Sequence, residues 1–330
     1  MIIHAKAPYR VSFFGGGTDY PPYYLQHGGS VISTTINKHI NLFLKQSSSF
    51  SRNRYIIKYS QIEMVDSINE IYHPVVKAVF SHFDLHEGVE LNIMSDAPAG
   101  SGLGSSSVFT VALLGAVLCL KGLNYSNLDI ARLAIMVEQE LLGEKVGSQD
   151  QYASAVGGFN HIRFEKSGLI EHTPIYLPHK KSDQFFDNLY LVYTKATRKN
   201  ETVTLEQDKK LQKGQLDEYM VEMKKLTINA KQLLLDLHFD EFGMLLNSAW
   251  DIKKNFATNV TIPEIDELYD FGIGNGALGG KLLGAGNGGF VLFYVPEANR
   301  LSFENAILKS GRPFSKLRSD FFGLTTKILN

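Results

Sequence analysis

The sequence predicts an α+β protein in which strands and helices segregate into layers. Residues 1–59 are rich in strand patterns, helical patterns then take over, and the second half mixes both without regular strand–helix–strand alternation. With 330 residues, 44% hydrophobic and 20% charged, the chain can bury a sizeable core. We expect two domains, 1–180 and 181–330, because residues 174–187 are polar and contain prolines.

In the first half, strands are expected where apolar and polar residues alternate, and helices where apolar residues recur at helical spacing or form a long run. The expected strands are Ile2–Ala5, Arg10–Phe14, Ser30–Ile36, Asn41–Lys45, Ile56–Tyr59, Val89–Ile93 and Phe159–Phe164. The expected helices are Pro74–Phe83, Val108–Leu120, Leu128–Leu142 and Gln151–Val156.

The second half is expected to be more helical. Its expected helices are Asp217–Leu237, Phe239–Phe256, Pro263–Asn275 and Glu297–Lys309. Strand patterns cover Leu189–Tyr193 and Phe290–Val295, and the glycine-rich stretch Lys281–Gly289 precedes the second of them.

Composition excludes several classes of protein. A formal net charge of -1 gives no global basic field for nucleic acid or an anionic membrane. The longest apolar run, Val108–Leu120, is too short to span a bilayer, and the first ten residues lack the features of a secretion signal. One cysteine, Cys119, cannot form a disulfide within the chain and is expected to be a buried, inert thiol. We therefore expect a cytoplasmic enzyme.

The loop Pro98–Ser107, with the sequence PAGSGLGSSS, is the strongest functional signal. It lies between the expected strand Val89–Ile93 and the apolar helix Val108–Leu120. Glycines let a backbone approach an anion closely, and the start of the next helix presents its positive dipole end, so this context suits a bound phosphate. A glycine-rich turn with a serine N-cap is the structural alternative.

The loop does not fit two common nucleotide-binding templates. A Walker loop requires lysine after its last glycine, where this chain has Ser105 after Gly104. A dinucleotide fingerprint requires glycine at the position of Ser105 and an acidic residue about twenty positions on, which is absent.

Three separated segments together resemble the GHMP kinase superfamily. Ala7–Tyr20 (APYRVSFFGGGTDY) is similar to the galactokinase signature, Pro98–Ser107 to the central phosphate loop, and Lys281–Phe290 (KLLGAGNGGF) to the C-terminal glycine motif. The resemblance implies an N-terminal domain like domain 2 of ribosomal protein S5 and a C-terminal ferredoxin-like α/β sandwich, with the active site between them. The glycines Gly15–Gly17 and the stretch Gly147–Tyr152 (GSQDQY) look most like the D-glycero-D-manno-heptose 7-phosphate kinases.

The resemblance implies ATP as co-substrate and Mg²⁺ as cofactor. The ATP-binding residues carried over from it are Pro98, Gly100, Ser101, Gly102, Leu103, Gly104, Ser105, Ser106 and Ser107. The hydroxyl of Ser106 would bind the metal, although a helix N-cap is an equal alternative for it. Glu138 would be the second metal ligand, with Glu140 as the competing assignment.

Two residues are the predicted catalytic pair. Asp150 follows Gly147–Gln149 and opens an expected helix, whose dipole favours a charged carboxylate there. The match to the family motif implies that Asp150 orients or deprotonates the acceptor hydroxyl. Arg10 would pair with Asp150 and stabilise the transferring phosphoryl group; a buried structural ion pair is the alternative for it.

The resemblance also implies a sugar pocket. Asp19 would accept hydrogen bonds from sugar hydroxyls, and the other predicted substrate-binding residues are Gly16, Gly17, Thr18, Gly286 and Asn287. A second phosphate on the substrate needs placed cations, for which Arg198 is the leading candidate. Four further cations are weaker candidates: Lys195, Lys199, Arg52 and Arg54.

The stretch Lys281–Gly289 precedes a strand, so we expect it to pack against the phosphate loop; a hairpin-like turn is the alternative. The resemblance implies a sugar 1-kinase acting on the anomeric hydroxyl of a heptose 7-phosphate. Galactose is disfavoured, because Gly16 and Gly17 replace the usual Glu-His. An unphosphorylated sugar such as fucose, or a silent sugar- and nucleotide-binding relative, are the alternatives. The expected partners are ATP and a sugar phosphate, without nucleic acid or membrane, in a monomer or homodimer.

Overall fold

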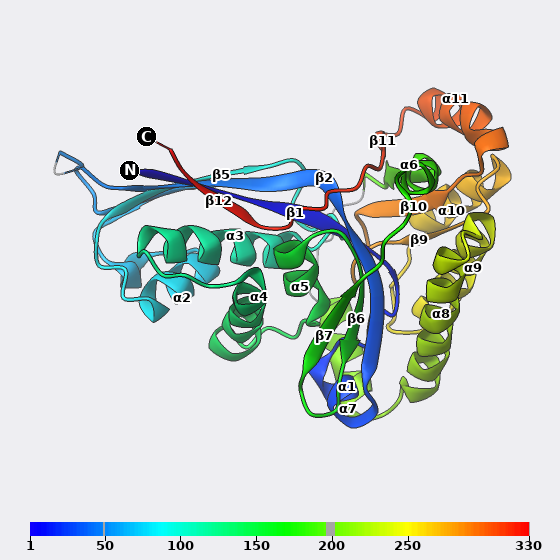
Figure 1. The fold of residues 1–330 in the computed structure, drawn as a ribbon, viewed down its shortest axis with the longest axis horizontal. Coiled ribbons are helices and arrows are strands. Elements are labelled where there is room, and N and C mark those ends of the chain that lie inside the picture. The colour runs from blue at the N-terminus through cyan, green and yellow to red at the C-terminus, as the bar shows by residue number, and fades with distance from the viewer. Residues whose placement is uncertain (49, 196–201, 330) are drawn as a thin grey trace.

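The computed structural model describes residues 1–48, 50–195 and 202–329, and it confirms the predicted α+β architecture. Two sheets, each covered by helices, form the two halves of the molecule (Figure 1). The strands of the larger sheet are β1 (Ile2–Phe14), β2 (Gly29–Gln46), β3 (Tyr55–Lys58), β4 (Ile62–Val65), β5 (Val89–Ser95), β6 (Phe159–Phe164), β7 (Ile170–Pro174) and β12 (Thr325–Leu329). Those of the smaller sheet are β8 (Leu189–Tyr193), β9 (Gly279–Leu282), β10 (Phe290–Tyr294) and β11 (Phe314–Lys316).

Two long strands organise the larger sheet, whose order is β12-β1-β2-β5-β3-β4 with β6 and β7 branching from β2. Each of these long strands replaces two shorter strands expected from the sequence. The pairing of β1 with β2 shifts register between Pro8 and Arg10 and again between Ser12 and Phe14. Such irregularities re-aim side chains, and these two flank Arg10 and Ser12, which reach the candidate site.

Four of the five described helices of the first half, α2 to α5, cover one face of the larger sheet, and the short α1 lies apart from them (Figure 1). They are α1 (Pro21–His27), α2 (Pro74–His82), α3 (Ser105–Leu120), α4 (Asn127–Met136) and α5 (Gln149–Val156). From Ser107 to Leu118, α3 is buried, which explains its nearly unbroken apolar sequence. The expected helix Leu128–Leu142 is α4 followed by a π-helical turn, Val137–Leu141.

The second half contributes the other described helices, most of them around the smaller sheet, whereas the helix Thr202–Gln212 lies beside α1 (Figure 1). They are α6 (His179–Asp187), α7 (Thr202–Gln212), α8 (Asp217–Leu235), α9 (Phe239–Lys253), α10 (Pro263–Gly274) and α11 (Arg300–Ser310). Helix α9 packs on β9, and α8 contacts both α9 and the long strands β1 and β2, so it bridges the two halves (Figure 1).

Aromatic rings join the two halves. The ring of Phe13, on β1, lies 5.3 Å from that of Phe242 on α9 and 5.9 Å from that of Phe185 on α6. Such ring pairs stabilise beyond the apolar area that they bury. The strand that carries Arg10 and Ser12 is thus anchored to the second half.

The division at residue 180 remains a prediction. Helix α6 lies across the expected boundary, and the chain returns at its end to pair β12 with β1 in the larger sheet (Figure 1). None of the described helices is both long and apolar enough to cross a bilayer.

Candidate active site

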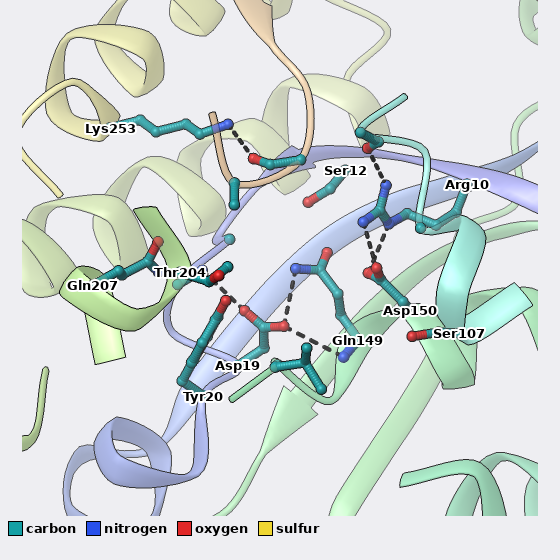
Figure 2. Close-up of a pocket in the computed structure, with 18 of the residues that line it drawn as sticks. Arg10, Ser12, Asp19, Tyr20, Ser107, Gln149, Asp150, Thr204, Gln207 and Lys253 are labelled. Carbon is teal, nitrogen blue, oxygen red and sulfur yellow. Dashed lines mark hydrogen bonds and ion pairs between the residues drawn. The ribbon is translucent and has the colours of Figure 1, made fainter. Parts of the chain in front are cut away.

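A cleft of about 310 Å³ is lined by both halves of the molecule. It is bordered by the end of β1 and the turn after it, the loop 98–107, the start of α5, helices α7 and α9, and the loop 281–289. Figure 2 shows Arg10 and Asp150 on one side of the cleft and Asp19 on the other. The cleft therefore brings together the three glycine-rich segments that resemble the family motifs.

The loop 98–107 leads into a helix without a side-chain cap. Gly104 is the N-cap residue of α3, with φ 81° and ψ 28°, and no side-chain cap bond forms there. The N-cap alternative for Ser106 is therefore wrong: this exposed serine lies in the first helical turn and lines the cleft. Uncapped N–H groups and the positive helix end make this position suited to an anion.

The loop turns its glycines toward the cleft. Six of the nine predicted ATP-binding residues line it: Gly100, Gly102, Gly104, Ser105, Ser106 and Ser107. The other three do not: Ser101 and Leu103 are each 1% exposed, and Pro98 is exposed away from the lining. The three glycines thus alternate with the buried Ser101 and Leu103, and the serines after Gly104 all face the cleft; the glycines are the residues that a phosphate can approach closely.

Arg10 and Asp150 form the predicted pair, side-on. Arg10 Nε donates to Asp150 Oδ1 at 2.7 Å and Nη2 donates to Oδ2 at 2.5 Å (Figure 2). Arg10 Nη1 donates to the carbonyl oxygen of Gly102 at 2.7 Å, which ties the pair to the phosphate loop. A Cβ at Gly104 would lie 2.8 Å from Asp150 Oδ2, so glycine allows the loop to pass over the pair.

Glu138 lies on the π-helical turn and is fully buried. Ser107 Oγ donates to its Oε2 at 2.8 Å, and Gln151 Nε2 donates to the same oxygen at 2.5 Å. Burial raises the pKa of Glu138 to about 7. The hydroxyl that reaches this carboxylate belongs to Ser107 and not to the predicted Ser106, and the competing Glu140 is exposed.

These oxygens fit a magnesium ion. Glu138 Oε1 is buried without a hydrogen-bond partner in the described structure, and the hydroxyl of Ser107 lies beside the same carboxylate. Within residues 1–48, 50–195 and 202–329, no group of three or more His, Cys, Asp or Glu side chains could hold a metal by itself. One carboxylate and one hydroxyl suit Mg²⁺, which takes few protein ligands and completes its shell with phosphates and water.

Asp19 lies in the wall of the cleft, held by protein donors. Its Oδ1 accepts from the backbone N–H of Gly17 at 2.9 Å, and its Oδ2 accepts from Gln149 Nε2 at 3.0 Å. Burial, with a contribution from the charge of Asp150, raises the pKa of Asp19 to about 6. A Cβ at Gly147 would lie 1.9 Å from Oδ2, so glycine is required there for the carboxylate to fit.

The other predicted substrate-binding residues divide into two groups. Gly16 and Gly17 line the cleft. Thr18 does not, because it is fully buried and its hydroxyl donates to the carbonyl oxygen of Gly15 at 2.7 Å. Gly286 and Asn287 do not line the described cleft: Asn287 N–H donates to Val260 O at 2.9 Å, and the C-terminal loop reaches the cleft through Gly284 and Ala285. Their role in substrate binding stays a prediction.

The C-terminal loop packs against the phosphate loop, as predicted, and it is also a hairpin turn between β9 and β10. The N–H of Phe290 donates to Ser101 O at 3.1 Å. A Cβ at Gly284 would lie 2.5 Å from Gly102 Cα, so the two backbones are in direct contact.

Two buried lysines in the cleft were not predicted. Lys281 Nζ donates to Phe13 O at 2.8 Å, and burial, together with the nearby charge of Arg10, lowers the pKa of Lys281 to about 7. Lys253 Nζ donates to Leu282 O at 2.7 Å. It also donates to the carbonyl oxygen of Gly284, the bond drawn in Figure 2, and so holds the C-terminal loop. Lys281 stands inside a recognised motif, whereas Lys253 is one lysine of an amphipathic helix and carries no signal in the sequence.

The predicted cations for a second phosphate are not in the described cleft wall. Arg198 and Lys199 lie outside the described residues. Lys195 does not line the cleft, and Arg52 and Arg54 lie in the loop between β2 and β3, where Arg54 binds the carbonyl oxygen of His86.

Comparison with known families and proteins gives a consistent result. Residues 69–158 match the profile of the GHMP kinases N terminal domain and residues 230–311 that of the GHMP kinases C terminal domain. A D-glycero-alpha-D-manno-heptose 7-phosphate kinase of Campylobacter jejuni is 30% identical over 320 residues, covering 93% of both chains. An L-fucokinase/L-fucose-1-P guanylyltransferase of Bacteroides fragilis is 26% identical over 96% of this chain and 37% of its own length.

Solved structures share the fold along the whole chain. A D-glycero-D-manno-heptose 1-phosphate kinase from Bacteroides thetaiotaomicron matches with a TM-score of 0.82 and 25% identity, covering 99% of both chains. A Lactococcus lactis galactokinase complexed with galactose matches with a TM-score of 0.73 and 20% identity, over 98% of this chain and 95% of that one. At that identity the second likeness bears on the fold alone.

Proposed function

Because the chain belongs to the GHMP kinases, and is therefore an ATP-dependent phosphotransferase acting on a sugar hydroxyl, we propose that its acceptor is D-glycero-α-D-manno-heptose 7-phosphate. The anomeric hydroxyl is phosphorylated and the product is the 1,7-bisphosphate, a step toward nucleotide-activated heptose. The observation that carries this choice of sugar is the Campylobacter jejuni relative of that name, which is 30% identical over 93% of both chains.

The geometry of the cleft supports the chemistry. The sugar lies between Asp19 and Asp150, with its anomeric hydroxyl at the Asp150 carboxylate, which orients it and takes up its proton. The hydroxyl oxygen bonds to the γ-phosphorus of ATP as the bond from that phosphorus to the bridging oxygen breaks, and ADP leaves. Arg10 holds Asp150 in place through two hydrogen bonds and adds positive charge beside the phosphate loop.

The phosphate loop would bind the triphosphate, and the buried carboxylate of Glu138 would bind the metal. The loop 98–107 holds the triphosphate with its glycine backbone and the uncapped start of α3. Ser107 and Glu138 are the residues that would hold magnesium, which supplies neutralising charge to the phosphates when it is bound. The Ser106 hydroxyl, exposed in the cleft, is a further contact for phosphate oxygens.

An assay with a panel of acceptors tests the proposal. The purified chain is incubated with ATP, Mg²⁺ and either the heptose 7-phosphate, the unphosphorylated heptose, fucose or galactose, and the products are followed by ³¹P NMR. We expect turnover of the heptose 7-phosphate with a new anomeric phosphate signal. Equal turnover of the heptose with and without its 7-phosphate would exclude this acceptor assignment.

An unphosphorylated sugar is the second candidate, favoured by the relatives with fucokinase names at 26% identity. The same panel separates it, because fucose then turns over and the 7-phosphate confers no advantage. ATP binding without turnover of any sugar in the panel, by the unmodified chain as well as by Asp150→Asn, would overturn the proposal.

A further inference from the structure

Two polar atoms in the wall of the cleft have no hydrogen-bond partner in the described structure. They are the hydroxyl oxygen of Ser12, on β1, and the amide oxygen of Gln149, at the start of α5. The two side chains are only 9% and 8% exposed, and both residues line the cleft. A buried polar atom without a partner costs about 1–3 kcal/mol, and a ligand hydroxyl in the cleft that bonds to it offsets this cost.

The orientation of the Gln149 amide follows from its neighbour. Its nitrogen donates to Asp19 Oδ2 at 3.0 Å, and a carboxylate can only accept. The amide oxygen must therefore point away from Asp19. Figure 2 shows it directed toward Ser12, between the Arg10–Asp150 pair and Asp19.

Gly16 leaves a space beside these two side chains. A Cβ placed on Gly16 would lie 3.7 Å from Ser12 Oγ and 3.8 Å from Gln149 Nε2, at ordinary van der Waals distance. An atom of a ligand can occupy that position without a clash. A hydroxyl oxygen that enters it needs to move less than about 1 Å closer to Ser12 Oγ to reach hydrogen-bond distance; the Gln149 amide oxygen lies beyond 4 Å of that position, so the hydroxyl must sit between it and Ser12 to reach both.

We propose that Ser12, Gly16 and Gln149 form a notch that binds a ring hydroxyl of the acceptor sugar and sets its orientation toward Asp150. The Gln149 amide oxygen accepts a hydrogen bond from that hydroxyl, and the Ser12 hydroxyl donates to it. Asp19 acts on the sugar partly through Gln149, as a positioning residue. This inference rests on the proposed sugar kinase function and names the contacts that select the acceptor.

The notch explains why a hydroxyl-bearing substrate is selected. A site built to hydrogen-bond a hydroxyl strongly disfavours an analogue that lacks it, because the buried groups of the site then stay unpaired. A matching deoxy sugar should therefore be a poor substrate of the unmodified enzyme.

Three variants and one matched control test the notch. Ser12→Ala and Gln149→Met remove its two polar groups, and Gly16→Ala fills its space. The control is Ser33→Ala: Ser33 lies opposite Ser12 in the β1–β2 pairing and its hydroxyl is also buried without a partner, but it does not line the cleft. The measurements are KM for sugar, KM for ATP, kcat, ATP affinity by calorimetry, and the melting temperature.

We expect Ser12→Ala and Gln149→Met each to raise the sugar KM about tenfold, and Gly16→Ala to raise it more, with ATP affinity within about twofold of the unmodified value. Ser33→Ala should leave all constants unchanged. With the deoxy sugar that lacks the recognised hydroxyl, the penalty of Ser12→Ala should disappear. Gln149→Met also removes a hydrogen-bond donor to Asp19 and can therefore prevent folding. In that case Ser12→Ala and Gly16→Ala alone test the notch.

The outcomes separate this inference from the proposed function. If the unmodified chain phosphorylates a sugar while Ser12→Ala and Gly16→Ala keep its sugar KM, the notch is wrong and the kinase stands. If the chain phosphorylates none of the sugars, binding of each sugar is measured by saturation-transfer NMR. Binding that Gly16→Ala abolishes then supports the notch alone, and absence of sugar binding overturns both.

Discussion

Arg10 and Asp150, which are 140 positions apart in the sequence, bond side-on through two parallel hydrogen bonds of 2.7 and 2.5 Å. Since a lysine cannot reproduce the planar guanidinium fork, the geometry assigns arginine specifically. The same guanidinium binds the carbonyl oxygen of Gly102, so one side chain positions both the carboxylate and the phosphate loop.

Replacing Asp150 should remove turnover while leaving ATP binding. We expect Asp150→Asn to lower kcat by about 10²- to 10⁴-fold, the usual value of a positioned base, with little change in ATP affinity. Arg10→Lys should also lower kcat, because it cannot hold the carboxylate side-on. The control is Arg163→Lys, which alters the exposed Arg163–Glu171 pair and should have no effect. Full activity of Asp150→Asn in steady-state assays would refute the assigned role.

The buried Glu138 should make magnesium binding depend on pH. Burial raises the pKa of Glu138 to about 7, so in the folded protein the carboxyl group is largely protonated below that pH and cannot bind a cation. Magnesium affinity, measured with a nonhydrolysable nucleotide, should increase as pH rises through about 7, with release of a proton. Glu138→Gln should abolish this dependence, whereas Glu140→Gln, on the exposed side of the same turn, should retain it.

The same group gives a stability prediction for the metal-free protein. Between the ordinary glutamate value of 4.5 and about 7, the folded state holds a proton on Glu138 that the unfolded state has lost. Its contribution to the free energy of unfolding therefore decreases as pH rises through this range. Melting temperatures of Glu138→Gln and the unmodified chain should diverge across it, with the variant relatively more stable at the higher pH. A constant difference would contradict this.

The motifs predicted from the sequence meet at the cleft. They could be recognised because glycine-rich loops and charged residues indicate phosphate binding by their residue types alone. The loop 98–107, the Arg10–Asp150 pair and the packing of the C-terminal loop on the phosphate loop could be expected from the residues and the family resemblance. What could not be predicted is which serine faces Glu138. A helix turns about 100° per residue, so the choice between Ser106 and Ser107 depends on the helix starting after Gly104, which no pattern specified.

Residues whose positions depend on packing between distant segments also could not be predicted from the sequence. Lys253 reaches the cleft because α9 packs on β9, and Gly286 and Asn287 leave it because their loop turns toward Val260. Two strands, Ile2–Ala5 and Arg10–Phe14, were expected where the structure has the single strand β1, which continues through Pro8 with a register shift against β2. These features depend on contacts between segments, which the local pattern does not contain.

The contact between the two glycine loops should tolerate no side chain. A Cβ at Gly284 would lie 2.5 Å from Gly102 Cα, and Gly284 has a positive φ of 71°. We expect Gly284→Ala to lower the free energy of unfolding by about 3 kcal/mol and to reduce turnover, because the loops must separate. Gly122→Ala is the matched control: it has a φ of 65° with nothing within 4 Å, so only about 1 kcal/mol of backbone strain is expected. Equal losses for the two variants in denaturant unfolding would show that the loop contact is unimportant.

Lys281 should take up a proton when ATP binds. Burial and the charge of Arg10 lower the pKa of Lys281 to about 7, so at about pH 8 its amine is largely neutral in the free protein. A triphosphate in the cleft favours the charged form and should raise that pKa, which draws a proton from the buffer. Titration calorimetry at about pH 8 in two buffers of different ionisation enthalpy measures this uptake, and Glu138 interferes little because its carboxyl group is already deprotonated there. We expect an uptake of up to about one proton for the unmodified chain and none for Lys281→Met. The control is Lys309→Met, which changes an exposed lysine at the end of α11 and should keep the full uptake. Equal proton uptake by Lys281→Met and the unmodified chain would assign the protonation to another group.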